Sequence, residues 1–127
     1  MRAIILDRHG RVLLVRRTYT TGWFLRGGGV ARGESVTDGL RRELREEVGV
    51  EPTGTPRILG MYSSTAEGKS DHIGVFVVEE WRRRPAQCAE VIEADFFAPD
   101  RLPPQTSPAT RRRIAEHRGQ RPIDYEW

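Results

Sequence analysis

The sequence predicts an α/β (α+β) fold in which one domain, residues 1–127, forms a mixed β-sheet flanked by helices. Three observations lead to this prediction. The length supports one hydrophobic core but not two. Short segments rich in Ile, Val and Leu outnumber the segments with helical character. Strand-like segments separate the two expected helices, so strands and helices are interleaved along the chain instead of forming separate blocks.

The strands are predicted from short apolar segments that are bounded by turn-forming residues. The first two, at 2–7 and 11–17, flank His9 and Gly10, which predict a hairpin turn between them. A third strand is expected at 23–25, immediately before a cluster of glycines. The remaining strands are expected at 57–63, 72–81 and 92–97.

The first helix is predicted from apolar residues that recur every four positions, namely Val36, Leu40, Leu44 and Val48. Ser35 suits the N-cap of this helix, and Gly49 marks its end. The second helix is predicted to begin at Ser107 and Pro108, because serine caps a helix and proline suits its first position. It is expected to run to about Arg118, and the tail after it has no assignment.

Composition excludes several classes of protein. No apolar run approaches the roughly 18 residues of a membrane span, and a charge follows the N-terminal apolar residues too early for a signal peptide. Cys88 is the only cysteine, so the chain forms no internal disulfide, and we expect a cytoplasmic location. The net charge is +3, and Lys69 is the only lysine among 21 basic residues. Arginine suits phosphate oxygens, but runs of three arginines give little support for nucleic-acid binding.

The stretch from residue 28 to residue 50 carries the candidate chemistry. On a helix, Glu43, Glu46 and Glu47 share an arc of roughly 100°. Such carboxylates repel one another unless a cation lies between them, and oxygen ligands suit hard divalent ions such as Mg²⁺ or Mn²⁺. The preceding glycines at 27–29 lack a Cβ, which lets a backbone carbonyl and a substrate come close. If the three glutamates are considered without the surrounding residues, the alternative to a metal site is an acidic helix face that is exposed to solvent.

The fixed residues around these glutamates resemble a known pattern. Gly28 is followed after five residues by Glu34 and after seven more by R-E-L-x-E-E-x-G-V, which ends at Val50. These residues match every fixed position of the Nudix hydrolase box. Segments 11–17, 23–25 and 90–97 resemble other parts of that family more loosely. The resemblance implies an α/β/α sandwich with a mixed sheet. It also implies Mg²⁺- or Mn²⁺-dependent hydrolysis of a nucleoside diphosphate linked to another group.

The resemblance also implies a metal site. Glu43 and Glu47 would bind the divalent cation together with the backbone carbonyl of Gly27, and Glu46 would share a bridging ion. Glu34 would link the loop to the helix or reach a metal through water. Arg42 would orient the glutamates.

The general base and the substrate contacts are less narrowly defined by the resemblance. The base would be a glutamate of the box or a later one, either Glu90 or Glu93, with Glu79 and Glu80 as further candidates. The expected substrate contacts are Arg17, Arg26, Gly28 and Gly29. Arg26 stands where the family usually has proline, so it offers a cation to phosphate but makes the loop entry less rigid.

Two other functions remain open: a domain that senses nucleotides without catalysis, and an enzyme that acts on RNA 5′ ends. The intact box argues against the sensor, and a steep dependence of affinity on salt would support the RNA enzyme. Among small molecules, nucleoside triphosphates, nucleotide sugars and dinucleoside polyphosphates are all compatible with the box. His72 could contact a base or phosphate, although an isolated histidine is more often a surface residue. A homodimer is a common assembly in this family.

Overall fold

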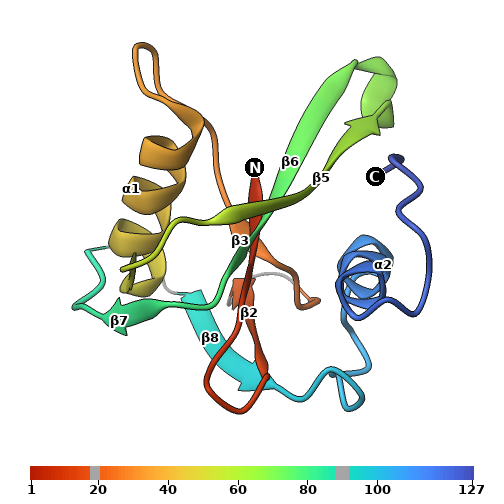
Figure 1. Ribbon diagram of the computed structural model, residues 1–127. Coiled ribbons are helices and arrows are strands. Elements are labelled where there is room, and N and C mark those ends of the chain that lie inside the picture. The colour runs from red at the N-terminus through yellow and green to blue at the C-terminus, as the bar shows by residue number, and fades with distance from the viewer. Residues whose placement is uncertain (18–20, 88–91) are drawn as a thin grey trace.

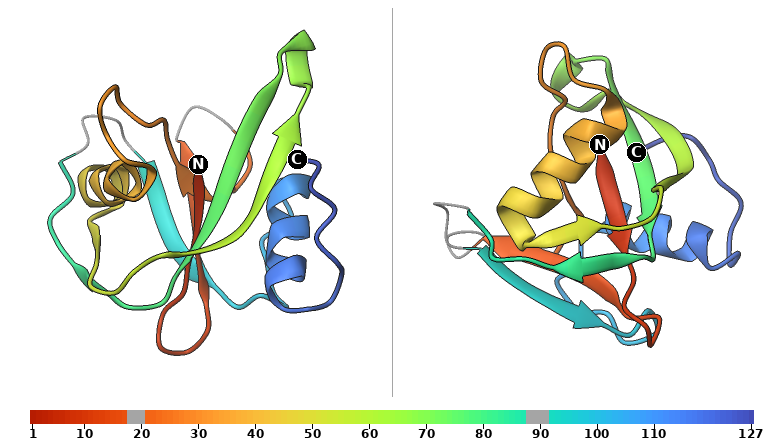
Figure 2. Two further views of the ribbon diagram at one scale, coloured as in Figure 1. Left: turned by 45° about the horizontal axis from the view of Figure 1, so that its top comes forward. Right: turned by 60° about the vertical axis from the view of Figure 1, so that its left-hand side comes forward.

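Figure 1 shows the computed structural model, which describes residues 1–17, 21–87 and 92–127. The strands lie between two helices, α1 (Val36–Val48) and α2 (Pro108–His117). Figure 2 shows the same arrangement from two further directions. The predicted mixed sheet flanked by helices is therefore confirmed. Neither of the two α-helices in the described ranges is long and apolar enough to cross a membrane.

The largest sheet has four strands in the order β3 (Arg26–Gly27), β1 (Arg2–Ile5), β6 (Asp71–Val78) and β5 (Arg57–Ser64). β1 and β6 are parallel, whereas β3 pairs with β1 and β5 pairs with β6 in the antiparallel sense, so the sheet is mixed. Two antiparallel pairs complete the fold: β2 (Val12–Arg17) with β8 (Ile92–Phe97), and β4 (Val50–Pro52) with β7 (Trp81–Arg83). A 3₁₀ turn, η1 (Ala66–Gly68), follows β5.

Strands β1, β2 and β6 bury both of their faces, and each face packs against one helix. Ile4 belongs to the core cluster that includes Ile114 of α2, whereas its neighbours Ala3 and Ile5 belong to the cluster that includes Leu44 of α1. This alternation is the period of two that a β-strand imposes on its side chains. The two-sided burial explains why these three strands are largely apolar.

Helix α1 has the bounds that the sequence predicts, because both ends are specified locally. The Ser35 hydroxyl accepts a hydrogen bond from the Asp38 amide at 3.1 Å. Gly49 ends the helix in the left-handed conformation, with φ at 66°, and donates its N–H to the Leu44 carbonyl. Val36, the first of the four regularly spaced apolar residues, is 47% exposed and belongs to neither core cluster.

The strand predicted at 72–81 is two strands. β6 ends at Val78, and β7 begins at Trp81 and pairs with β4, an element that the sequence did not predict. Pro52 closes β4 at its pairing with Trp81, a position at a strand end where a missing N–H is tolerated. The predicted turn at Gly10 is present, with its N–H on the Asp7 carbonyl at 3.0 Å.

The strands on either side of that turn diverge after a single bridge between Leu6 and Val12. β1 continues into the four-stranded sheet and β2 pairs with β8, so they do not form the hairpin that the sequence predicts. The unassigned tail packs back against the molecule. Trp127 donates its N–H to the Ser63 carbonyl at 2.9 Å, which places the tail beside β5.

Candidate metal centre and substrate cleft

A cleft of about 620 Å³ opens beside the N-terminal end of β1. In Figures 1 and 2 this end of β1 lies between α1 and β6. The walls of the cleft come from β1, the end of β2, β3 with the glycines that follow, the start of β6, and α1. Segments that are far apart in the sequence thus meet at one opening.

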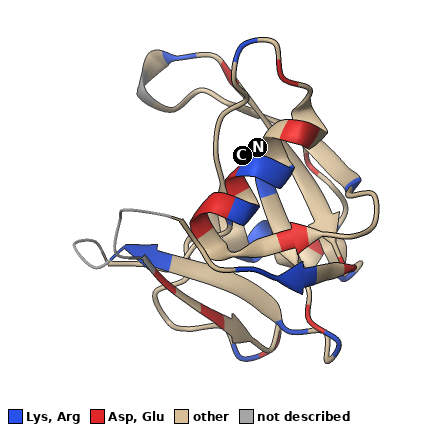
Figure 3. Ribbon diagram, turned by 90° about the vertical axis from the view of Figure 1, so that its left-hand side faces the viewer, with Lys and Arg blue, Asp and Glu red and all other residues tan. Residues whose placement is uncertain are grey.

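Helix α1 contributes two carboxylates to this cleft. Glu43 and Glu47 both line it, as their spacing of one helical turn allows. Their side chains are 14% and 24% exposed. Glu46, which the sequence groups with them, is not among the lining residues and is 41% exposed. Figure 3 shows that basic residues are interspersed with these acidic ones along the helix.

Two glycines allow close approaches that a Cβ would block. A Cβ on Gly28 would lie 2.4 Å from the Glu43 carboxyl carbon, so only glycine leaves room for this carboxylate. A Cβ on Gly27 would lie 1.9 Å from the Met1 carbonyl oxygen, a backbone atom of the neighbouring strand. The backbone of the loop therefore approaches both β1 and the Glu43 carboxylate closely.

Alanine substitutions at these two glycines are expected to have different effects. In Gly28→Ala the new methyl group meets the end of a flexible side chain, so the fold survives while Glu43 is displaced and turnover falls about tenfold or more. In Gly27→Ala it meets backbone, which costs about 1–3 kcal/mol of stability. Urea unfolding and turnover, measured on both variants, check the contrast. Equal stability losses in the two variants would contradict it.

Arg42 joins the loop to helix α1. Its Nε donates to Glu34 Oε2 at 2.7 Å and its Nη1 to Glu43 Oε1 at 3.1 Å. Glu34 also accepts the Ala31 N–H at 2.8 Å. Arg42 lies 3.7 Å from Glu46, so its shorter contacts are with the two other carboxylates. The hydrogen bond from Arg42, followed by that from Ala31, lowers the pKa of Glu34 to about 2.

This depressed pKa predicts how Glu34 affects stability at low pH. A carboxylate whose pKa is lower in the folded state stabilises the fold fully above its unfolded pKa, here near 4.5, and loses that contribution as the pH falls toward about 2. We therefore expect Glu34→Gln to be less stable than the wild type at pH 6, with the difference shrinking below pH 4.5. Urea unfolding between pH 2 and pH 6 checks this. A difference that does not change with pH would contradict it.

Arg26 is also in the cleft, where its guanidinium lies against the carboxylates of α1. Its Nη2 contacts the Glu47 carboxylate and lies 4.0 Å from Glu43 Oε2. The residue is only 6% exposed. A positive charge thus stands between the two carboxylates, which explains how they lie side by side.

As the side chains stand, the described part of the chain has no group of three His, Cys, Asp or Glu residues placed to hold a metal ion. The donor set nevertheless fits a hard divalent cation. Glu43 and Glu47 offer only oxygen ligands, both line the cleft, and Arg26 shows that one cation can face both carboxylates.

Further cationic residues line the cleft. Arg17, which the sequence predicts, comes from the end of β2, and Arg2, which it does not predict, comes from the start of β1. Burial and then the neighbouring Arg26 guanidinium lower the pKa of Arg2. Asp71 and His72 line the cleft as well, from the start of β6. Arg2 and Asp71 carried no recognisable signal, because the parallel pairing that brings β1 and β6 together is not visible in the sequence.

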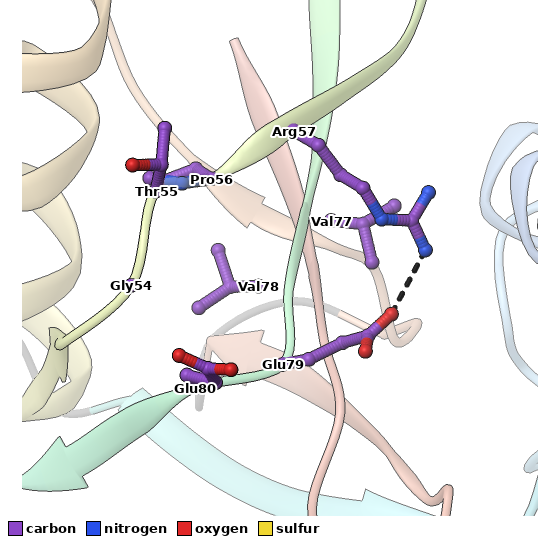
Figure 4. A pocket seen from close by; sticks show the side chains of 8 residues that line it. All are labelled: Gly54, Thr55, Pro56, Arg57, Val77, Val78, Glu79 and Glu80. Atoms are coloured by element: carbon purple, nitrogen blue, oxygen red, sulfur yellow. Dashed lines mark hydrogen bonds and ion pairs between the residues drawn. The ribbon is translucent and has the colours of Figure 1, made fainter.

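Of the later glutamates that are candidates for the general base, those in the described part of the chain do not line the cleft. Glu93 accepts a hydrogen bond from Arg16 at 2.6 Å and is not among the lining residues. Glu90 lies outside the described residues. Glu79 and Glu80 line a separate pocket of about 240 Å³, where Arg57 donates to Glu79 at 2.8 Å (Figure 4). This pocket shares no lining residue with the cleft.

The fold and the cleft define a class of α+β domain in which a glycine loop and the carboxylates of one helix line the same cleft. Within that class, the model of the NUDIX domain matches residues 1–117, and the chain belongs to this family.

Two curated relatives have different names. An ADP-ribose pyrophosphatase of Methanocaldococcus jannaschii is 32% identical over 104 residues, which cover 78% of this chain and 61% of that protein. An RNA pyrophosphohydrolase of Hydrogenovibrio crunogenus is 39% identical over 57 residues, which cover 45% of this chain and 34% of that protein. The chain therefore spans less than two thirds of the length of either relative.

Two solved structures are similar over nearly the whole chain. The E. coli ORF135 protein is 26% identical with a TM-score of 0.71, over 97% of this chain and 91% of that one. A MutT NUDIX hydrolase from Burkholderia pseudomallei is 26% identical with a TM-score of 0.70, over 89% of this chain and 95% of that one. These likenesses agree with the layered fold described above.

Proposed function

We propose that the chain is a Mg²⁺-dependent pyrophosphohydrolase that cleaves a nucleoside diphosphate linked to another group. The observation that carries this proposal is the cleft itself, where the Glu43 and Glu47 carboxylates share one opening with the Arg2 and Arg17 side chains. A divalent cation suits the carboxylates, and a diphosphate suits both the cation and the arginines.

The metal-binding residues in this proposal are Glu43 and Glu47, together with the Gly27 carbonyl. Glu46 lies on the same helix but does not line the cleft, so it would contribute to the metal site less directly. Mn²⁺ is the alternative ion. Arg42 fixes Glu43 through the hydrogen bond at 3.1 Å and ties the helix to Glu34 in the loop. The bound ion supplies charge neutralisation on the diphosphate oxygens and lowers the pKa of water.

The substrate-binding residues are the arginines and glycines of the cleft. Arg17 and Arg2 bind phosphate oxygens and orient the diphosphate, because a guanidinium donates two parallel hydrogen bonds to such groups. Gly28 and Gly29 let the substrate lie against the backbone. Orientation of this kind accounts for much of the catalysis in phosphoryl transfer.

In the reaction, a water oxygen forms a bond to one phosphorus while the phosphoanhydride P–O bond breaks, and a carboxylate takes the proton from water. Among the described residues, Glu43 and Glu47 are the box carboxylates that line the cleft. We therefore propose a box glutamate as the base in preference to Glu93, which is held by Arg16.

The substrate class follows from the relatives only as a proposal. The ADP-ribose pyrophosphatase matches 78% of this chain, whereas the RNA pyrophosphohydrolase matches 45%. Small nucleotides are therefore the preferred substrates, with nucleotide sugars first in the panel to be tested. We also propose that residues 1–127 act as one domain in the cytoplasm. Light scattering on the purified protein decides between a monomer and a homodimer.

The experiment that tests the function is turnover of a mixed nucleotide panel, with Mg²⁺ and with a chelator. The panel contains triphosphates, nucleotide sugars, dinucleoside polyphosphates and a triphosphorylated RNA. Cleavage of a small nucleotide that stops with the chelator is expected. Preferential cleavage of the RNA, with an affinity that falls steeply with salt, would replace the small-molecule proposal. Binding without cleavage would indicate a sensor.

A further inference from the structure

Arg26 is the one position of the loop entry where this chain departs from the pattern that it resembles, and its side chain occupies the space between the proposed metal ligands. Its Nη2 contacts Glu47 and lies 4.0 Å from Glu43 Oε2. At 6% exposure it is among the few buried charged residues in the described part of the chain, so this arrangement is an internal ion pair and not a loose surface contact.

We propose that Arg26 is an internal cation that stabilises the paired carboxylates in the metal-free protein, and that it must leave them before a divalent ion can bind. This inference rests on the metal site of the proposed function and adds to it a competition within the site. Arg26 then acts as a positioning residue that sets the metal affinity through Glu43 and Glu47.

The competition follows from the chemistry of the groups. A guanidinium carries only donors and has no lone pair with which to ligate a metal, so it cannot remain between the carboxylates as part of the coordination shell. The guanidinium and the divalent ion are both positively charged, and like charges in contact with the same carboxylates repel strongly inside a protein. Metal affinity is therefore reduced by the stability of the Arg26 ion pair.

The released side chain stays close to the substrate. Arg26 lines the same cleft as Arg2 and Arg17, and its charge already contributes to the lowered pKa of Arg2. Three guanidiniums in one cleft favour an anion, so a diphosphate stabilises Arg26 in its released position. Metal and substrate binding thereby become mutually favourable, because each ligand favours the protein state that the other requires.

The test measures Mn²⁺ binding to the nucleotide-free protein by electron paramagnetic resonance, with wild type, Arg26→Met and Arg2→Met. Arg2→Met is the matched control. It removes a cation from the same cleft, but among the described contacts Arg2 forms no ion pair with the Glu43 or Glu47 carboxylate. We expect Arg26→Met to bind Mn²⁺ at least tenfold more tightly than wild type, and Arg2→Met to stay within threefold of it. Equal affinities in all three proteins, or equal tightening in both variants, would overturn the inference.

A second measurement uses the wild type alone and does not depend on the variant folding. The Arg26 Nε–H signal, observed by nuclear magnetic resonance, is expected to shift on addition of Mg²⁺, in parallel with metal binding. An unchanged signal at saturating metal would overturn the inference. Failure of the proposed function is distinguishable, because then neither wild type nor Arg26→Met binds Mn²⁺ at all.

Discussion

Replacing Glu47 by glutamine is expected to lower Mg²⁺-dependent turnover at least about a hundredfold while the protein stays folded. The side chain keeps its shape, but the amide is a much weaker ligand for a hard cation than the carboxylate. A metal site supplies several kcal/mol of transition-state stabilisation, and each 1.36 kcal/mol corresponds to a factor of about ten in rate. Turnover at saturating substrate, measured over a range of Mg²⁺ concentrations, checks this expectation.

Two further variants make this prediction specific. Glu51→Gln is the matched control, because Glu51 lies on β4 and pairs with Arg82 at 3.0 Å, outside the cleft. It is expected to keep wild-type turnover. Glu46→Gln is expected to lose about tenfold or less, since Glu46 does not line the cleft. Undiminished turnover in Glu47→Gln, or an equal loss in Glu51→Gln, would contradict the metal centre.

The second large effect is expected on stability, at Arg113 of α2. This residue is fully buried and its Nε lies 2.6 Å from Glu116 Oε1, which is equally buried. Its guanidinium also lies over the Tyr62 ring at 3.9 Å and is 3.1 Å from Asp124. Arg113→Met leaves the Glu116 charge buried without its cation, which costs about 3–5 kcal/mol.

A double variant separates the effect of the unpaired Glu116 charge from the other effects of removing Arg113. Glu116→Gln keeps an acceptor for the Tyr62 hydroxyl, which donates to Glu116 at 2.9 Å, but removes the charge. The double variant Arg113→Met/Glu116→Gln is therefore expected to recover more than half of the stability lost in Arg113→Met. Arg111→Met, at an exposed position of the same helix, is the control and is expected to change stability by less than about 0.5 kcal/mol. Urea unfolding measures all of these variants. A loss below 1 kcal/mol in Arg113→Met would contradict the account.

The parts of the fold that the sequence predicted well are those specified by local interactions. Helix α1 begins and ends where Ser35 and Gly49 predict, because a cap is a contact between residues a few positions apart. Pairing between distant strands carries no such local signal. For this reason β4 was not predicted from the sequence. A single strand was predicted where β6 and β7 are separated at Glu79 and Glu80, since β6 pairs with β5 and β7 pairs with β4.

The same distinction applies to the candidate site. The box glutamates lie on one helix, so their spacing alone predicts that Glu43 and Glu47 face the same way. Arg2 and Asp71 reach the cleft only through the parallel pairing of β1 with β6, which no short motif encodes. The contact between Arg26 and Glu47 depends on the packing of β3 against α1, and the sequence suggested only that Arg26 could face phosphate.

The most direct test of the central claim is mass spectrometry of the products formed from an ADP-ribose-type nucleotide sugar and a nucleoside triphosphate in ¹⁸O-labelled water, with and without Mg²⁺. The account predicts cleavage at a phosphoanhydride bond, one ¹⁸O atom in a phosphate-containing product, and no reaction without the divalent ion. Cleavage at a phosphoester or glycosidic bond, or turnover that persists with a chelator, would contradict it.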